Sequence, residues 1–161
     1  MSEVLFPKVY NYNFVKSINT SVASITLPNW TCNDIDYTTF DFSGFTQVES
    51  IEIGDDSFCS VQTFQIDGLN RFKTIKIGNN SFTHHKNSAG NDESKSFHIL
   101  NCESLESIQI GEFSFSDFAG DFELKNLPQL QSIQIGTIGR ESNNFNSSSF
   151  VIRGIDMILN I

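Results

Sequence analysis

The 161 residues of the chain are enough to bury one substantial hydrophobic core, and no shift in composition indicates a second domain. The formal net charge is −9 and the ten lysines and arginines are scattered, which argues against a nucleic-acid partner, because phosphate binding needs clustered basic side chains. No apolar run is long enough for membrane insertion, and residues 1–20 lack the apolar run of a signal peptide. With three cysteines, an odd number, the chain is predicted to be cytoplasmic with reduced thiols.

Residues 1–20 show no repeat, and we expect them to fold over the first coil as a cap. From residue 21 to residue 161 one apolar pattern recurs, Phe-x-apolar-x-x-apolar-x-x-apolar-x-x-Ile-x-Ile-Gly, and its last copy stops at the first isoleucine of Ile-x-Ile. The copies start near residues 40, 64, 97, 122 and 150, which lie 24, 33, 25 and 28 residues apart. A repeat of this length is typical of a solenoid, in which each unit buries its apolar face against the next.

Each unit contains two strand patterns joined by an irregular segment. The closing Ile-x-Ile places two β-branched side chains on one face of an extended segment, and the opening Phe-x-Ile predicts a second strand in the same way. Between them, apolar residues occupy every third position, which suits short irregular or 3₁₀ turns with one inward side chain each. We expect Gly54, Gly78, Gly111 and Gly136 to turn the chain at positive φ. The predicted fold is a β-rich solenoid of stacked parallel strands.

The segment Ile99-x-x-Cys102-x-x-Leu105-x-x-Ile108-x-Ile110 resembles the BspA-like class of leucine-rich repeat, which shows Phe-x-x-Cys-x-x-Leu-x-x-Ile-x-Ile-Pro in each unit. The resemblance covers roughly residues 20–161. Leu27-Pro28 keeps the closing proline, whereas the later copies have glycine there. The resemblance implies a right-handed, leucine-rich-repeat-like solenoid that serves protein recognition or adhesion in bacteria or protists, without catalysis. It also implies a location at the cell surface, as an alternative to the cytoplasm.

The outward positions of the Ile-x-Ile strands form two columns of polar residues. One column holds small hydroxyl side chains: Ser24, Ser50, Thr74, Ser107 and Ser132. The other holds mostly longer side chains: Thr26, Glu52, Lys76, Gln109 and Gln134. We interpret this face as the surface that binds a protein partner, with simple solvation of the sheet as the alternative. A carbohydrate-active β-helix protein would share the stacking, but its sites usually need clustered carboxylates, and here Glu52 is next to a lysine.

Two polar insertions lengthen the repeat, at residues 83–96 and 141–149. Insertions in solenoids form loops on one face, and that face is often functional, so we expect both to project from the same corner. The candidate partner-binding residues in the first insertion are His84, His85, Lys86, Asp92 and Glu93. A tolerated surface loop is the alternative. We expect Phe145, which lies in the second insertion, to matter little for stability.

A metal site could be built from His84 and His85 with Asp92, Glu93 or Cys59, but no His-x₃-His or Cys-x₂-Cys pair accompanies them. The sequence also lacks a glycine-rich phosphate loop and any recognisable nucleophile with its base. We therefore predict no metal, no cofactor and no catalytic residue. The chain is expected not to be an enzyme.

The last coil places Ile155, Ile158 and Ile161 at inward positions with nothing after them to cover them. Native solenoids protect such ends, because a bare end exposes apolar side chains and unpaired strand edges. We expect another chain to cover this coil, either a second copy in a homodimer or a larger assembly, or else the chain is a fragment of a longer array. A structural subunit docked through this end is the alternative to a recognition module.

Overall fold

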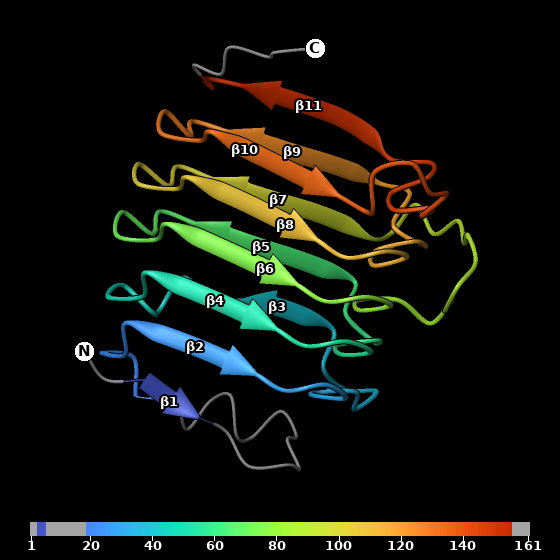
Figure 1. Cartoon of the computed structure of the whole chain (residues 1–161), viewed down its shortest axis with the longest axis horizontal. Helices are drawn as coiled ribbons and strands as arrows, with labels where there is room; N and C mark the ends of the chain where they lie inside the picture. Colours follow the sequence, from blue (N-terminus) through green and yellow to red (C-terminus); the bar gives the residue numbers. More distant parts are fainter. Residues whose placement is uncertain (1–2, 6–18, 156–161) are drawn as a thin grey trace.

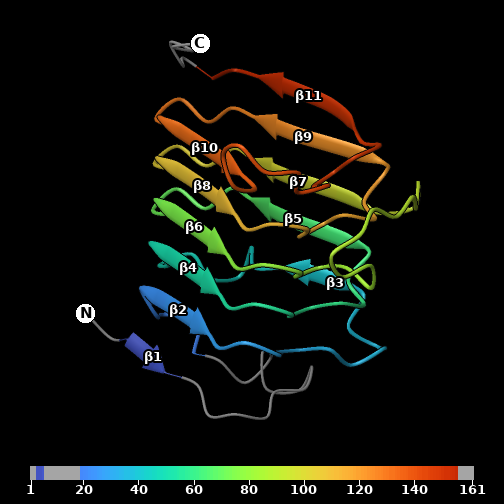
Figure 2. The same ribbon diagram turned by 45° about the vertical axis from the view of Figure 1, so that its right-hand side comes forward.

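The structure is a computed structural model that describes residues 3–5 and 19–155. In these residues the chain winds as a parallel β-solenoid whose two sheets face each other, and its first and last strands lie at opposite ends of the stack (Figure 1). A view turned by 45° shows the same alternation of the chain between the two sheets (Figure 2). The described residues form no helix. The predicted solenoid of parallel strands is confirmed.

The Ile-x-Ile segments form the larger sheet, here called sheet A, with the strand order β1-β2-β4-β6-β8-β10. Its strands are β1 (Glu3–Leu5), β2 (Ser24–Leu27), β4 (Ser50–Ile53), β6 (Thr74–Ile77), β8 (Ser107–Ile110) and β10 (Ser132–Ile135). β1 pairs in parallel with β2, so the amino-terminal segment adds an edge strand to this sheet. Residues 1–2 and 6–18 of the expected cap lie outside the described residues.

The Phe-x-Ile segments form the second sheet, here called sheet B, with the strand order β11-β9-β7-β5-β3. Its strands are β3 (Thr39–Asp41), β5 (Thr63–Asp67), β7 (Ser96–Leu100), β9 (Asp121–Lys125) and β11 (Ser149–Arg153). Equivalent residues pair from coil to coil, as Ile51 does with Ile75 in sheet A and Phe64 with Phe97 in sheet B. The predicted register of the repeats is therefore confirmed.

Between the strands, the three-residue spacing corresponds to single turns. The Phe45 nitrogen donates to the Phe42 carbonyl and the Val48 nitrogen donates to the Phe45 carbonyl, each at 2.9 Å. These bonds follow one another without overlapping, so they close separate turns, and the described residues contain no 3₁₀ helix. Of the two predicted conformations, the irregular turn is the one that forms.

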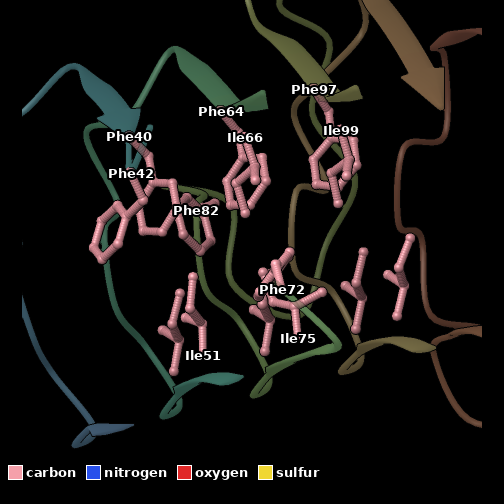
Figure 3. Close-up of a cluster of buried hydrophobic side chains, with 14 of the residues drawn as sticks. Phe40, Phe42, Ile51, Phe64, Ile66, Phe72, Ile75, Phe82, Phe97 and Ile99 are labelled. Carbon is pink, nitrogen blue, oxygen red and sulfur yellow. The ribbon is translucent and has the colours of Figure 1, made fainter. Parts of the chain in front are cut away.

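The core between the sheets contains two columns of stacked phenylalanine rings. Figure 3 shows Phe40, Phe64 and Phe97 of one column and Phe82 of the other. The first column follows sheet B, and the second follows the corner that leads into it. The first is Phe40, Phe64, Phe97 and Phe122; the second is Phe58, Phe82, Phe115 and Phe145. Rings stack within a column and meet the other column edge to face, as Phe64 and Phe82 do at 5.3 Å between centroids. Phe82 therefore belongs to the second column and not to that of Phe64.

The prediction that Phe145 is peripheral is wrong. Its side chain is only 2% exposed, and its ring stacks on Phe115 at 4.9 Å between centroids. Asn144 occupies the position that serine holds in earlier coils: its Nδ2 donates to the Gly111 carbonyl at 2.7 Å, as the Ser114 hydroxyl does to the Gly78 carbonyl. The extra residues of this coil are thus 137–141, ahead of the corner, and the insertion does not match the first one in position.

The role predicted for the strand-ending glycines is also wrong, except at Gly136, which has a φ of 71°. Gly54, Gly78 and Gly111 are not at positive φ. A Cβ on Gly78 would instead lie 2.7 Å from both the Asp55 nitrogen and the Gly54 carbonyl carbon of the preceding coil. Glycine is needed there because the coils approach closely.

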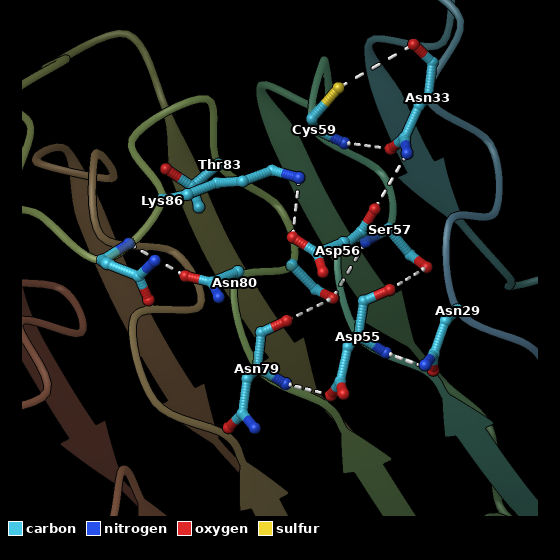
Figure 4. A network of polar contacts seen from close by, with 12 residues as sticks. Asn29, Asn33, Asp55, Asp56, Ser57, Cys59, Asn79, Asn80, Thr83 and Lys86 are labelled. Carbon is cyan, nitrogen blue, oxygen red and sulfur yellow. Dashed lines mark hydrogen bonds and ion pairs between the residues drawn. The ribbon is translucent and has the colours of Figure 1, made fainter.

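Positive φ occurs at two non-glycine residues in each corner that leads from sheet A into sheet B. The pairs are Trp30 and Cys32, Asp56 and Phe58, Asn80 and Phe82, Phe113 and Phe115, and Asn143 and Phe145. This conformation turns the backbone N–H groups along the solenoid axis, so that Asp56 donates to the Asn79 carbonyl of the next coil and Phe58 to the Thr31 carbonyl of the previous one. Side chains add hydrogen bonds between neighbouring coils. The Asn29 side chain accepts from the Asp55 nitrogen, and the Asp55 side chain accepts from the Asn79 nitrogen (Figure 4).

Candidate functional site

The outer face of sheet A carries a shallow hollow of about 280 Å³ that spans β2, β4, β6 and β8. It forms because the column of small hydroxyl residues lies beside the column of longer side chains. Its polar lining comes from both columns: Ser24, Thr26, Ser50, Glu52, Thr74, Lys76, Ser107 and Gln109. The structure thus brings together three of the four sheet residues predicted to bind a partner.

The fourth, Gln134, lies outside the hollow. It is exposed on the edge strand β10, and its Nε2 donates to the Gly136 carbonyl at 3.4 Å. In the register of sheet A it pairs with Gln109, so it continues the column of longer side chains without lining the hollow.

An ion pair crosses the hollow between the two neighbouring strands β4 and β6. Lys76 Nζ lies 2.9 Å from Glu52 Oε1, with the lysine and glutamate side chains 58% and 51% exposed. An ion pair so exposed contributes on the order of 0–1 kcal/mol to stability, because water screens it and both side chains lose freedom. The pair is therefore weak enough to rearrange when a ligand contacts it.

The hydroxyl groups on the floor of the hollow differ in their bonding. Ser24 and Ser50 hydrogen-bond to each other at 2.8 Å between hydroxyl oxygens. Within the described part of the chain, the Thr74 and Ser107 hydroxyls and the Gln109 side-chain amide have no hydrogen-bond partner in the protein. The half of the hollow over β6 and β8 therefore offers donors that a ligand can use.

A second cluster of charges precedes the same two strands. Glu49 accepts from Lys73 at 2.8 Å and from Arg71 at 2.9 Å. These hydrogen bonds, that from Lys73 first, hold the pKa of the Glu49 carboxyl below its usual value. Glu49 is thus a carboxylate at neutral pH, so the two strands carry glutamates on the β4 side and basic residues on the β6 side.

The loop residues predicted as binding residues lie elsewhere, at the corner between the sheets, and none of them lines the hollow. Lys86 reaches across to an earlier coil, where its Nζ lies 2.6 Å from Asp56 Oδ1 (Figure 4). The same Nζ is 4.2 Å from the ring centroid of Trp30, which is 63% exposed. His84, His85 and Glu93 are exposed.

Asp92 has a structural position in the loop. Its Oδ1 accepts hydrogen bonds from the hydroxyl and the backbone nitrogen of Ser94, and these lower the pKa of Asp92, with the hydroxyl contributing most. Its backbone nitrogen donates to the Asp117 carbonyl, and its carbonyl accepts from Ala119, both across to the next coil. Residues 90–96 are therefore packed against residues 116–120.

A buried ion pair that the sequence pattern did not predict anchors this loop. Lys95 Nζ lies 2.7 Å from Asp117 Oδ2, and the two side chains are 6% and 5% exposed. The Lys95 ammonium is also 5.5 Å from the ring centroid of Phe118, and Asp117 Oδ1 is buried without a partner. Neither residue belongs to a repeated apolar position, so the apolar pattern carried no signal for the pair.

The cysteines are free, and two of them are buried. Burial raises the pKa of Cys32 to about 12 and that of Cys102 to about 11, so both stay as neutral thiols at physiological pH. Cys59 is half-buried in a corner, where its backbone nitrogen donates to the Asn33 side chain at 3.0 Å (Figure 4). In residues 19–155, no three His, Cys, Asp or Glu side chains cluster in a way that could hold a metal ion.

The last coil exposes two apolar side chains of β11. Phe150 and Ile152 are 54% and 55% exposed, although their equivalents in the preceding coil, Phe122 and Leu124, are buried. Ile155 is half-buried against the core. Ile158 and Ile161 lie outside the described residues.

The described residues contain no helix with the length and apolar character needed to cross a membrane. Comparisons of the chain with protein-family models, with curated proteins and with solved structures find no match.

Proposed function

We propose that this β-solenoid is a non-catalytic module for protein interaction or adhesion that binds a protein partner through the outer face of sheet A. The observation that carries the proposal is the hollow around the Glu52–Lys76 ion pair, where exposed charges lie beside donors without a partner in the described structure. A stiff sheet presents these groups at fixed spacing, which lowers the cost of ordering them on binding. The exposed residues His84, His85 and Lys86 at the start of the 83–96 loop add a second contact at the corner.

We also propose a handedness and a repeat class for the solenoid. The apolar spacing of the repeats supports a right-handed solenoid of the leucine-rich-repeat type, resembling the BspA-like class. Right-handed connections between parallel strands are also strongly favoured on physical grounds. Proteins of such architecture present long, regular surfaces to other proteins.

Site-specific photo-crosslinking tests the proposed surface. A benzophenone amino acid replaces Gln109 on the outer face of β8, and in a matched control it replaces His98 on the outer face of β7 in the same coil. We expect a crosslinked protein from a native cell extract only with the probe at residue 109, and alanine at Glu52 and Lys76 to reduce its yield. Crosslinks from residue 98 alone would place the partner on sheet B and refute the proposal.

A second candidate, a structural subunit that docks through its last coil, is favoured by the exposed side chains of Phe150 and Ile152. Sedimentation velocity at micromolar concentration tests it. The wild type would sediment as a dimer or larger species, and Phe150→Glu would return it to the monomer. A wild type that is monomeric throughout this range excludes self-association as the function of the coil.

A further inference from the structure

The donors in the hollow are arranged asymmetrically around Lys76. In the register of sheet A, Lys76 pairs with Glu52 on β4 and with Gln109 on β8. The ammonium therefore has a carboxylate on one side and a neutral amide on the other. Strands are about 4.8 Å apart, so an anion between Lys76 and Gln109 would mirror the position of the Glu52 carboxylate.

The floor of the hollow continues this asymmetry. On the β4 side, Ser50 is bonded to Ser24, and Glu52 supplies the acceptor oxygens. On the β6 and β8 side, the Thr74 and Ser107 hydroxyls have no partner among the described residues. A carboxylate accepts several hydrogen bonds and donates none, so it matches a site that offers an ammonium, two hydroxyls and an amide.

We propose that this half of the hollow binds one side-chain carboxylate, an Asp or Glu, in an extended segment of the protein partner. The inference rests on the proposed function of sheet A and adds the chemistry of its ligand. A single carboxylate fits better than a polyanion, because Lys76 is the only lysine or arginine among the described residues that line the hollow, and the whole chain carries a net charge of −9. The ligand segment is accordingly neutral or basic apart from this residue.

A selection from a random dodecapeptide phage library on the immobilised wild-type protein supplies the probes. Selected peptides are synthesised with amidated carboxyl termini, so that only side-chain carboxylates remain, and each is paired with its Glu→Gln or Asp→Asn analogue. Binding is measured to the wild type, to Lys76→Met, and to the control Lys125→Met on β9 of sheet B. Ser107→Phe, which fills the floor of the hollow, reports whether a peptide binds there. A denaturation midpoint equal to that of the wild type confirms that each variant is folded.

We expect the amide analogues to bind the wild type and Lys125→Met at least about tenfold more weakly than the acidic peptides, as for loss of a hydrogen bond to a charged group. On Lys76→Met the two peptides should bind equally. In the contrary case, Ser107→Phe abolishes binding while the difference in affinity between the acidic peptide and its amide analogue persists on Lys76→Met. That result overturns the carboxylate proposal but still supports the outer face of sheet A as the binding surface. If the selection yields no peptide sensitive to Ser107→Phe, both proposals are overturned.

Discussion

Replacing Phe145 by alanine tests the stacked core at the coil where sequence and structure disagree. Its ring stacks on Phe115 at 4.9 Å and meets Phe97 and Phe122 edge to face at 5.2 and 4.8 Å between centroids. Truncation removes the buried ring and leaves a cavity, so we expect a loss of about 3–5 kcal/mol in the free energy of unfolding. For a domain of this size, a loss of 4 kcal/mol lowers Tm by roughly 8–16 °C.

Phe150→Ala is the matched control, because the same residue type lies in the adjoining strand but is 54% exposed. Less apolar surface is lost and the space left is open to water, so we expect about 1–2 kcal/mol. Urea denaturation followed by circular dichroism measures both losses, and an unchanged m value shows that the same array unfolds in each variant. A loss at Phe145 no larger than that at Phe150 would refute the two-column core.

Three further predictions concern the coil contacts, the buried thiol and the loop anchor. Gly78→Ala should destabilise the protein by about 1–3 kcal/mol because its Cβ meets the preceding coil, whereas Gly44→Ala, which points into open space, should be nearly neutral in the same urea assay. Cys32 has its pKa raised from 9.0 to about 12, so above pH 9 the unfolded state loses this proton first. The contribution of Cys32 to the free energy of unfolding should then fall by about 1.4 kcal/mol per pH unit up to the native pKa. Between about pH 8 and pH 11, the free energy of unfolding should therefore decline less steeply with pH in Cys32→Ala than in the wild type. Lys95→Met leaves the Asp117 carboxylate buried without its partner and should cost about 3–5 kcal/mol, part of which Lys95→Met/Asp117→Leu should recover; no loss in the single variant would contradict the buried pair.

The repeat pattern alone was sufficient to predict both sheets and their register. Strand side chains alternate between two faces, so Ile51-x-Ile53 and Phe64-x-Ile66 identify inward residues without any knowledge of distant contacts. The same alternation assigned Glu52, Lys76 and Gln109 to one outer column, and the structure places all three in the hollow. The alignment of equivalent units thus predicted part of the candidate site.

The errors arose where neighbouring coils determine what a residue does. Gly78 suggests a turn when only its own segment is considered. In the structure, residues 54 and 55 of another coil occupy the space that a Cβ at this position would need. Extra residues precede Phe145, so its position in the repeat could not be assigned from the spacing. The stacking of its ring on Phe115 in the structure assigns it to the second column.

The polar anchors were beyond the reach of the sequence for a related reason. Lys86 contacts Trp30 and Asp56, and Lys95 contacts Asp117, across separations of 22 to 56 residues that no period relates. The sequence by itself determined which side chains face the core, because strand geometry repeats locally. Only the tertiary structure decided how the corners and the loop pack, because those contacts depend on where separate coils come to lie.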